Sequence, residues 1–169
     1  PKAGKVISIP RGVTVTCRYD SVFFSKITNG ICKNDRFVTQ IAIPGTTELL
    51  EGPIQRVQTQ IIAGKSELST LETNRQAFFD LKKTGLAIQA RFFRAGDRFC
   101  PLGMTGSKKL KSFFIDQKVP QSMRSHIPIL TNADDDIIWV YGQRISHLYR
   151  VTDKTEKVLF IEGDKAINY

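Results

Sequence analysis

Apolar and polar residues alternate along several short segments of this chain, and no other feature constrains its fold as strongly. The alternation has a period of two residues, which is typical of half-buried β-strands. It runs through residues 13–19, 37–43, 57–61 and 86–92, and short apolar segments at 22–24, 137–141 and 158–161 complete the set. Many short strands with few helical segments predict a mainly β domain of the α+β class.

The length of 169 residues suits one domain with its own core. We predict a single domain over residues 1–169, with a strand-rich lead-in at 1–75 and a motif-bearing core at 86–145. No apolar run approaches the roughly 20 residues of a membrane helix, and the first residues resemble no targeting peptide. The chain does not begin with Met, so we expect a piece of a longer protein.

One segment has a helical pattern. Leu110, Phe113 and Phe114 fall at positions i, i+3 and i+4, which places them on one face of a helix. Ser107 is expected to cap the start of this helix, and Pro120 is expected to end it. A second short helix is predicted around residues 122–125.

The positive charge of the chain is concentrated in a quarter of its length. Of the net charge of +9, residues 82–124 contribute most, with ten basic and two acidic residues. Such clustering is typical of a surface that binds a polyanion. A basic surface without a partner is the alternative.

Three arginines, Arg91, Arg94 and Arg98, lie within eight residues. The planar guanidinium group suits phosphate oxygens and stacks on bases. Asp97, between them, is expected to be structural, paired with Arg94 or Arg98 rather than catalytic.

A glycine-containing loop follows the arginines. Gly103 and Gly106 allow a ligand to approach the backbone closely. Lys108 and Lys109 are expected in the first helical turn, where the helix dipole disfavours cations, so a phosphate there would be stabilising. A solvated, lysine-rich helix end is the alternative. The nucleotide-binding P-loop pattern is not matched, and the Gly-x-x-Gly pattern of KH domains is matched only weakly.

Catalytic and metal-binding patterns are missing from the sequence. His126 and His147 are expected to lie at the surface or to pack in the core rather than to act as a general base. Asp134, Asp135 and Asp136 are expected to form a solvated turn, and Trp139 is expected to lie in the core. The three cysteines, Cys17, Cys32 and Cys100, are widely spaced, which disfavours a zinc site and favours a reducing, cytoplasmic location. We therefore predict no catalytic residue, no metal site and no cofactor within this chain.

The ordered motif in residues 86–145 resembles the C-terminal domain of bacterial tRNA(Ile)-lysidine synthetases. The resemblance rests on Arg91-x-x-Arg94-x-Gly96-Asp97-Arg98-Phe99-x-Pro101-x-Gly103-Met104-x-Gly106-x-Lys108-Lys109-Leu110-Lys111-x-Phe113-Phe114-Ile115-Asp116-x-Lys118-Val119-Pro120, followed by Arg124, Pro128, Trp139-Val140-x-Gly142 and Arg144-Ile145. Residues 1–85 match more loosely. Gln121 departs from the family, in which a basic residue often follows Val-Pro, and Cys100 is a second departure.

The resemblance implies a fold and an activity. The fold would be a closed Greek-key β barrel with one or two short helices, similar to a domain of the phenylalanyl-tRNA synthetase β subunit. The family enzyme uses ATP to attach lysine to the wobble cytidine of a minor isoleucine tRNA. That chemistry belongs to an N-terminal ATP-pyrophosphatase domain with a Ser-Gly-Gly-x-Asp-Ser loop, which this sequence lacks. We therefore expect this chain to be inactive alone.

The implied role is to bind tRNA in its acceptor-stem region, with the chain's own N-terminal catalytic domain as its other partner. The residues expected to contact RNA are Arg91, Arg94, Arg98, Lys108, Lys109, Lys111, Lys118, Arg124 and Arg144, with a phosphate loop at Gly103, Gly106 and Ser107. Two alternatives stay open, a protein-interaction barrel that forms a homodimer and a self-sufficient enzyme.

Overall fold

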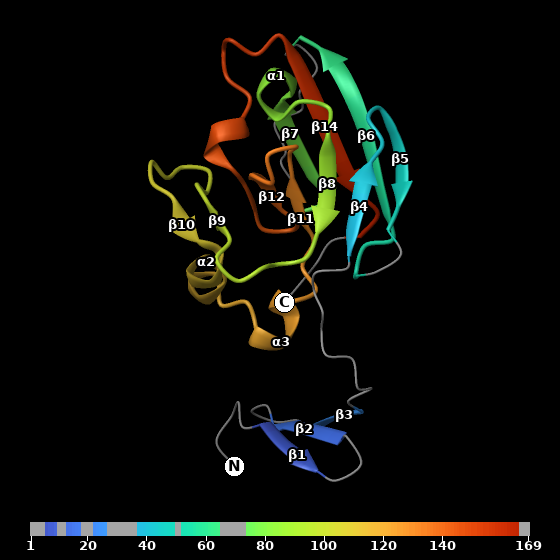
Figure 1. The fold of residues 1–169 in the computed structure, drawn as a ribbon, viewed down its shortest axis with the longest axis vertical. Helices are drawn as coiled ribbons and strands as arrows, with labels where there is room; N and C mark the ends of the chain where they lie inside the picture. Colours follow the sequence, from blue (N-terminus) through green and yellow to red (C-terminus); the bar gives the residue numbers. More distant parts are fainter. Residues whose placement is uncertain are drawn as a thin grey trace. The chain divides into compact units, whose positions relative to one another are not determined.

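A computed structural model describes residues 6–9, 13–17, 22–26, 37–49, 52–64 and 74–165. The chain divides into two compact units, Pro1–Lys33 and Asn34–Tyr169. The small unit holds an antiparallel sheet in the order β1-β2-β3, formed by β1 (Val6–Ile9), β2 (Val13–Cys17) and β3 (Val22–Lys26) (Figure 1). The predicted strands are thereby confirmed over residues 13–17 and 22–24, whereas residues 18 and 19 of the first prediction lie outside the described residues.

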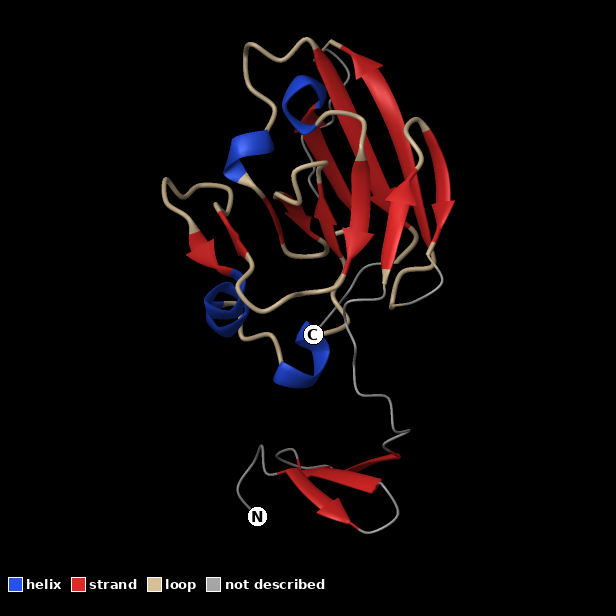
Figure 2. Ribbon diagram, in the orientation of Figure 1, coloured by secondary structure: helices blue, strands red, loops and turns tan. Residues whose placement is uncertain are grey.

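The described residues of the main unit, Asn34–Tyr169, form two large antiparallel sheets and one two-stranded ribbon (Figures 1 and 2). The five-stranded sheet has the order β13-β12-β11-β8-β4, from β4 (Val38–Ile41), β8 (Ile88–Arg91), β11 (Ile129–Thr131), β12 (Ile137–Val140) and β13 (Arg144–Ile145). The four-stranded sheet has the order β5-β6-β14-β7, from β5 (Gly45–Glu48), β6 (Arg56–Ala63), β7 (Gln76–Asp80) and β14 (Lys157–Gly163).

The main core lies between these two sheets. Ile41, Ala90 and Leu130 from the five-stranded sheet and Phe79 and Leu159 from the four-stranded sheet are buried in one cluster. Trp139, predicted as a core residue, also belongs to this cluster. Burial of these side chains is the main stabilisation of the pair of sheets.

The α+β, mainly β class is confirmed, but the expectation of a closed barrel is wrong. In neither sheet does the last strand pair back onto the first within the described residues. The sheets remain open and pack face to face, because the strands of the lead-in divide between them. β4 pairs with β8 in one sheet, whereas β5 and β6 extend the other. The lead-in strands of residues 37–63 are thus integral to the fold.

A third layer covers the other face of the five-stranded sheet. We call it the helical layer; it comprises β9 (Arg98–Phe99), β10 (Lys108–Lys109), α2 (Leu110–Asp116) and α3 (Gln121–Arg124) (Figure 1). Its second core joins Phe99, Leu110, Phe113 and Phe114 to Ile129, Ile137 and Val140 of the sheet beneath. Two short helices, α1 (Leu81–Thr84) and the 3-10 helix η1 (His147–Tyr149), lie elsewhere in the unit.

The predicted helix after the glycine-containing loop is confirmed as α2, since Leu110, Phe113 and Phe114 are its buried residues. The second predicted helix is α3, which starts directly after Pro120. The expected cap at Ser107 is wrong. Lys109 is the N-cap residue of α2 and makes no side-chain capping bond, and Lys108 and Lys109 pair with β9 as a short strand.

No helix in the described part of the chain is both long and apolar enough to cross a membrane.

The last described strand, β14, is the central strand of its sheet. It pairs with β6 over seven positions on one side and with β7 over five on the other. At its end, Gly163 lies against Tyr141, and a Cβ atom added at Gly163 would overlap the Tyr141 hydroxyl group. The same hydroxyl donates to the carbonyl oxygen of Lys165 at 2.7 Å. Only glycine therefore fits at this position.

We predict that Gly163→Ala destabilises the main unit by about 1–3 kcal/mol, because the buried Tyr141 ring has to move and overpacking costs energy of this order. Chemical denaturation of both proteins measures the difference. Gly106→Ala is the control, since no atom lies within 4 Å of its added Cβ. Equal stabilities of Gly163→Ala and Gly106→Ala would contradict the prediction.

Candidate nucleic-acid interface

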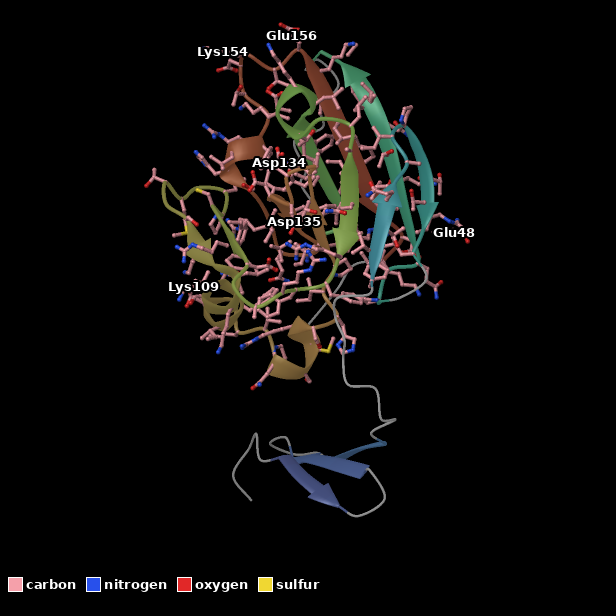
Figure 3. All side chains as sticks on the ribbon, in the orientation of Figure 1. Glu48, Lys109, Asp134, Asp135, Lys154 and Glu156 are labelled. Carbon is pink, nitrogen blue, oxygen red and sulfur yellow. The ribbon has the colours of Figure 1, made fainter. Side chains whose placement is uncertain are left out.

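A pocket of about 520 Å³ opens between the helical layer and the loop after β8. We call it the basic pocket. Three of the predicted RNA contacts line it: Lys109, Lys111 and Arg124. Its other walls are Phe93, Ala95, Gly96 and Asp97 from the loop and Gln121 and Ser125 from α3 and its end. The labelled residue Lys109 shows in Figure 3 where the basic pocket lies.

The charges of the basic pocket are largely unneutralised. Lys109 and Lys111 are exposed, and no carboxylate among the described residues forms an ion pair with either. In the β9–β10 ribbon, Lys109 lies directly opposite Arg98. Like charges at facing positions of two strands destabilise the pair. An anion bound beside them would remove this repulsion.

Arg124 is held in place by the backbone. Its Nε and Nη2 atoms donate to the carbonyl oxygen of Val119 at 3.0 and 2.8 Å. These bonds leave the Nη1 group without an acceptor among the described residues. A guanidinium fixed in this way loses little conformational entropy when it binds an anion.

Arg91, by contrast, lies inside the protein with 1% of its side chain exposed. Its Nη1 and Nη2 atoms donate to the two carboxylate oxygens of Asp97, each at 2.9 Å, and its Nε donates to Asp135 at 2.7 Å. Nη1 also donates to the carbonyl oxygen of Phe92. Arg91 therefore does not belong to the exposed surface, and the expectation that it contacts RNA is not supported by its position.

Burial alone would lower the pKa of Arg91. The hydrogen bonds and the attraction of Asp97 and Asp135 outweigh it and raise the pKa above its ordinary value. The guanidinium thus stays charged in the interior. Asp97 is structural, as predicted, but its ion-pair partner is Arg91; from Arg94 it accepts only the backbone N–H, at 2.8 Å.

Two other predicted contacts are paired within the chain. Arg94 donates to Asp135 at 3.2 Å and is one-third exposed. Lys108 forms an ion pair with Asp116 of α2. Both cations are partly neutralised, which reduces the charge that each offers to a ligand.

The remaining predicted contacts lie outside the basic pocket. Lys118 and Arg98 are exposed, and Arg98 donates to the side chain and carbonyl of Ser107. Arg144 lines a separate, smaller pocket with Gln76 and Gln143. The cationic residues therefore do not form one continuous set in the structure.

The predicted phosphate loop is exposed at Gly103, Gly106 and Ser107, and none of the three lines the basic pocket. The N–H of Gly103 donates to Nδ1 of His147 at 3.4 Å. Because Lys108 and Lys109 precede α2 rather than occupying its first turn, the dipole argument for an anion does not apply. Phosphate binding by this loop stays a prediction.

The turn of residues 132–136 is built by hydrogen bonds. Asn132 accepts from the backbone N–H groups of Asp134 and Asp136. Asp135, which is labelled in Figure 3, forms ion pairs with Arg91 and Arg94. In the described part of the chain, no group of three or more His, Cys, Asp or Glu residues is placed to hold a metal ion.

Tyr149 stabilises this turn through two hydrogen bonds of its hydroxyl group. Its hydroxyl donates to Asp136 at 3.0 Å and accepts from the Asn132 amide at 3.1 Å. Burial, together with the bond to Asp136, raises the pKa of Tyr149 to about 12.

Phe93, Gln121 and Ser125 also line the pocket, although they are not among the residues predicted from the sequence. Gln121 and Ser125 are four residues apart and follow Pro120. Their spacing therefore predicts that they share one helical face with Arg124. Phe93 carried no such signal, since an aromatic residue after a strand is more often part of the core.

A model of the family described as "TilS substrate C-terminal domain" matches residues 88–161. The tRNA(Ile)-lysidine synthase of Caldanaerobacter subterraneus subsp. tengcongensis is 47% identical over 88 residues, which are 52% of this chain and 19% of that protein. The synthase of Clostridioides difficile is 32% identical over 165 residues, which are 97% of this chain and 34% of that protein. The chain thus spans between 19% and 34% of the length of these relatives.

Two solved structures are similar. A crystal structure of a TilS C-terminal domain aligns with a TM-score of 0.61 and 24% identity, over 79% of this chain and 100% of that one. An N-terminal fragment of the phenylalanyl-tRNA synthetase β-subunit from Pyrococcus horikoshii aligns over 52% of this chain and 27% of that one, with a TM-score of 0.46 and 18% identity. The first match supports the open, two-sheet fold described above.

We predict that Arg91→Ala destabilises the main unit by about 3–5 kcal/mol, because Asp97 and Asp135 lose the guanidinium that compensates them. Arg91→Lys should recover only part of this loss, since an ammonium group cannot form the two-pronged bond. Urea denaturation measures both effects. Exposed Arg144→Ala is the control and should leave stability unchanged; an equally small effect of Arg91→Ala would refute the role assigned to the pair.

Tyr149 should make stability depend on alkaline pH. Its pKa in the folded protein is above the ordinary value near 10, so the native state favours the neutral hydroxyl. Its contribution is complete below about pH 10 and is lost as the pH rises through about 12. The difference in unfolding free energy between the parent protein and Tyr149→Phe, measured from pH 9 to pH 12, should shrink over this interval. A constant difference would show that Tyr149 does not cause the dependence.

Proposed function

We propose a role for this chain from one premise: it belongs to the tRNA(Ile)-lysidine synthase family, whose C-terminal domain it carries. The role is to bind isoleucine tRNA in its acceptor-stem region and to hold it for a catalytic domain elsewhere in the enzyme. That domain would use ATP to attach lysine to the wobble cytidine. This chain contributes binding and no step of the chemistry.

One observation carries the proposal, namely the gathering of Lys109, Lys111 and Arg124 around a single pocket with little neutralisation. Positive side chains that lack carboxylate partners can neutralise RNA phosphates and thereby release the counterions condensed on the RNA. This release makes RNA binding favourable and dependent on salt concentration. A-form RNA is recognised mainly through its phosphates, its 2′-hydroxyl groups and its shape. A pocket edged by lysines and one fixed arginine suits that kind of recognition.

We predict that Lys109→Ala with Lys111→Ala weakens binding of an isoleucine tRNA transcript and lowers the slope of log K against log salt concentration by about 2, or about 1 for each phosphate contact removed. Fluorescence anisotropy at several salt concentrations measures both quantities. Arg124→Ala in addition should weaken binding further.

The matched control is Lys154→Ala with Lys157→Ala. It removes two exposed lysines as well, and Lys154 lies well away from Lys109, at the end of the main unit near the start of β14 (Figure 3). Net charge falls equally in the two double variants, so only the location of the charges differs. Equal salt slopes for the two would contradict the proposed interface, and a parent protein without measurable tRNA affinity would contradict the proposed function itself.

A further inference from the structure

The basic pocket is larger and more apolar than phosphate binding alone requires. Its volume of about 520 Å³ lies within the roughly 300–1,000 Å³ range of sites that enclose small molecules. Phe93, Ala95 and Gly96 supply an apolar wall, and the aliphatic stems of the lysines extend it. Phosphate groups on an RNA surface need only charge and hydrogen-bond donors. The apolar wall therefore indicates that the ligand has a second, apolar group that packs against it.

The ring of Phe93 is the main part of that wall, and it is fixed. It packs on the second core and meets the ring of Phe114 edge to face, with centroids 5.8 Å apart and an interplanar angle of 75°. The residue is only partly buried, and its remaining surface lines the pocket. An aromatic ring held in this manner is the type of platform on which unstacked bases bind.

Polar groups face the same space from α3. Gln121 is exposed and its side chain forms no hydrogen bond among the described residues, so its amide offers both a donor and an acceptor. Arg124, three residues later, still has its Nη1 donors free. An amide suits the edge of a base, and a guanidinium suits a phosphate.

We propose that the basic pocket takes an unpaired nucleotide of the bound RNA. Its base lies against Phe93 with an edge at Gln121, and its phosphate lies between Lys109, Lys111 and Arg124. The inference rests on the proposed function, because it requires RNA to be bound at this surface.

A paired nucleotide does not satisfy this arrangement. Inside an A-form duplex the faces of each base are covered by its neighbours, and specific contacts to RNA bases are therefore made mostly at single-stranded ends, loops and bulges. The pocket consequently favours a helix that carries an unpaired extension, such as the end of an acceptor stem, over a blunt helix of the same sequence.

Two RNA hairpins with the acceptor-stem sequence of isoleucine tRNA test this, one blunt and one with a single-stranded 3′ extension. The parent chain should bind the extended hairpin about fivefold or more tightly than the blunt one, as expected for one aromatic–base stack. Phe93→Leu keeps the apolar volume but removes the aromatic face. It should abolish the preference, so that the two hairpins bind the variant with equal affinity.

Phe78→Leu is the matched control. Phe78 is also half-buried and also contacts another ring, that of Phe160 at 5.0 Å, but it lies on β7 in the other sheet. It should retain the preference, and thermal unfolding of both variants shows whether either fold is damaged. The nucleotide pocket is overturned if the parent chain shows no preference or if Phe93→Leu keeps it. Salt-dependent tRNA binding would in either case leave the proposed function standing, whereas absence of RNA binding would overturn both.

Discussion

The interior ion pair of Arg91 with Asp97 and Asp135 is the constraint on which the rest of the interface depends. It joins three parts of the chain, namely the end of β8, the loop after it and the turn of residues 132–136. A charge removed from water is tolerated only when its donors are satisfied, so these segments are held in one arrangement. The carbonyl oxygen of Asp97 in turn accepts from the N–H of Leu110 at 2.8 Å, which fixes the start of α2 against the same loop. The walls of the basic pocket follow from these bonds.

Ion pairs within the chain divide the basic residues into two groups. Arg91, Arg94 and Lys108 are engaged by carboxylates of the chain, and they serve its stability more than its affinity for a polyanion. Lys109, Lys111 and Arg124 keep their charge available at the pocket. A net charge in a stretch of sequence thus overstates what a ligand meets, since part of it is balanced by carboxylates brought close only by folding.

Much of the fold could be predicted from local pattern. Alternation located β2, β4, β6 and β8, and short apolar segments located β3, β12 and β14. The spacing of Leu110, Phe113 and Phe114 located α2, because all these signals arise within one element. The burial of Arg91 could not be predicted, since its second partner, Asp135, is 44 residues away in the sequence. The closed barrel failed for a related reason, because it was inferred from a resemblance and depends on which distant strands pair. The sequence identifies Gln121 only as a departure from the family pattern, whereas its place on the pocket wall makes it a hydrogen-bonding group.

The central position of β14 has a consequence for biosynthesis. In the four-stranded sheet, β6 and β7 do not pair with one another. They are connected only through β14, which lies between them and is translated last among the described strands. Until the ribosome has made β14, these two strands expose unpaired edges and one side of the main core. The four-stranded sheet of the main unit is therefore completed only after β14 has been translated, and a chain truncated before β14 would keep these edges unpaired and prone to aggregation.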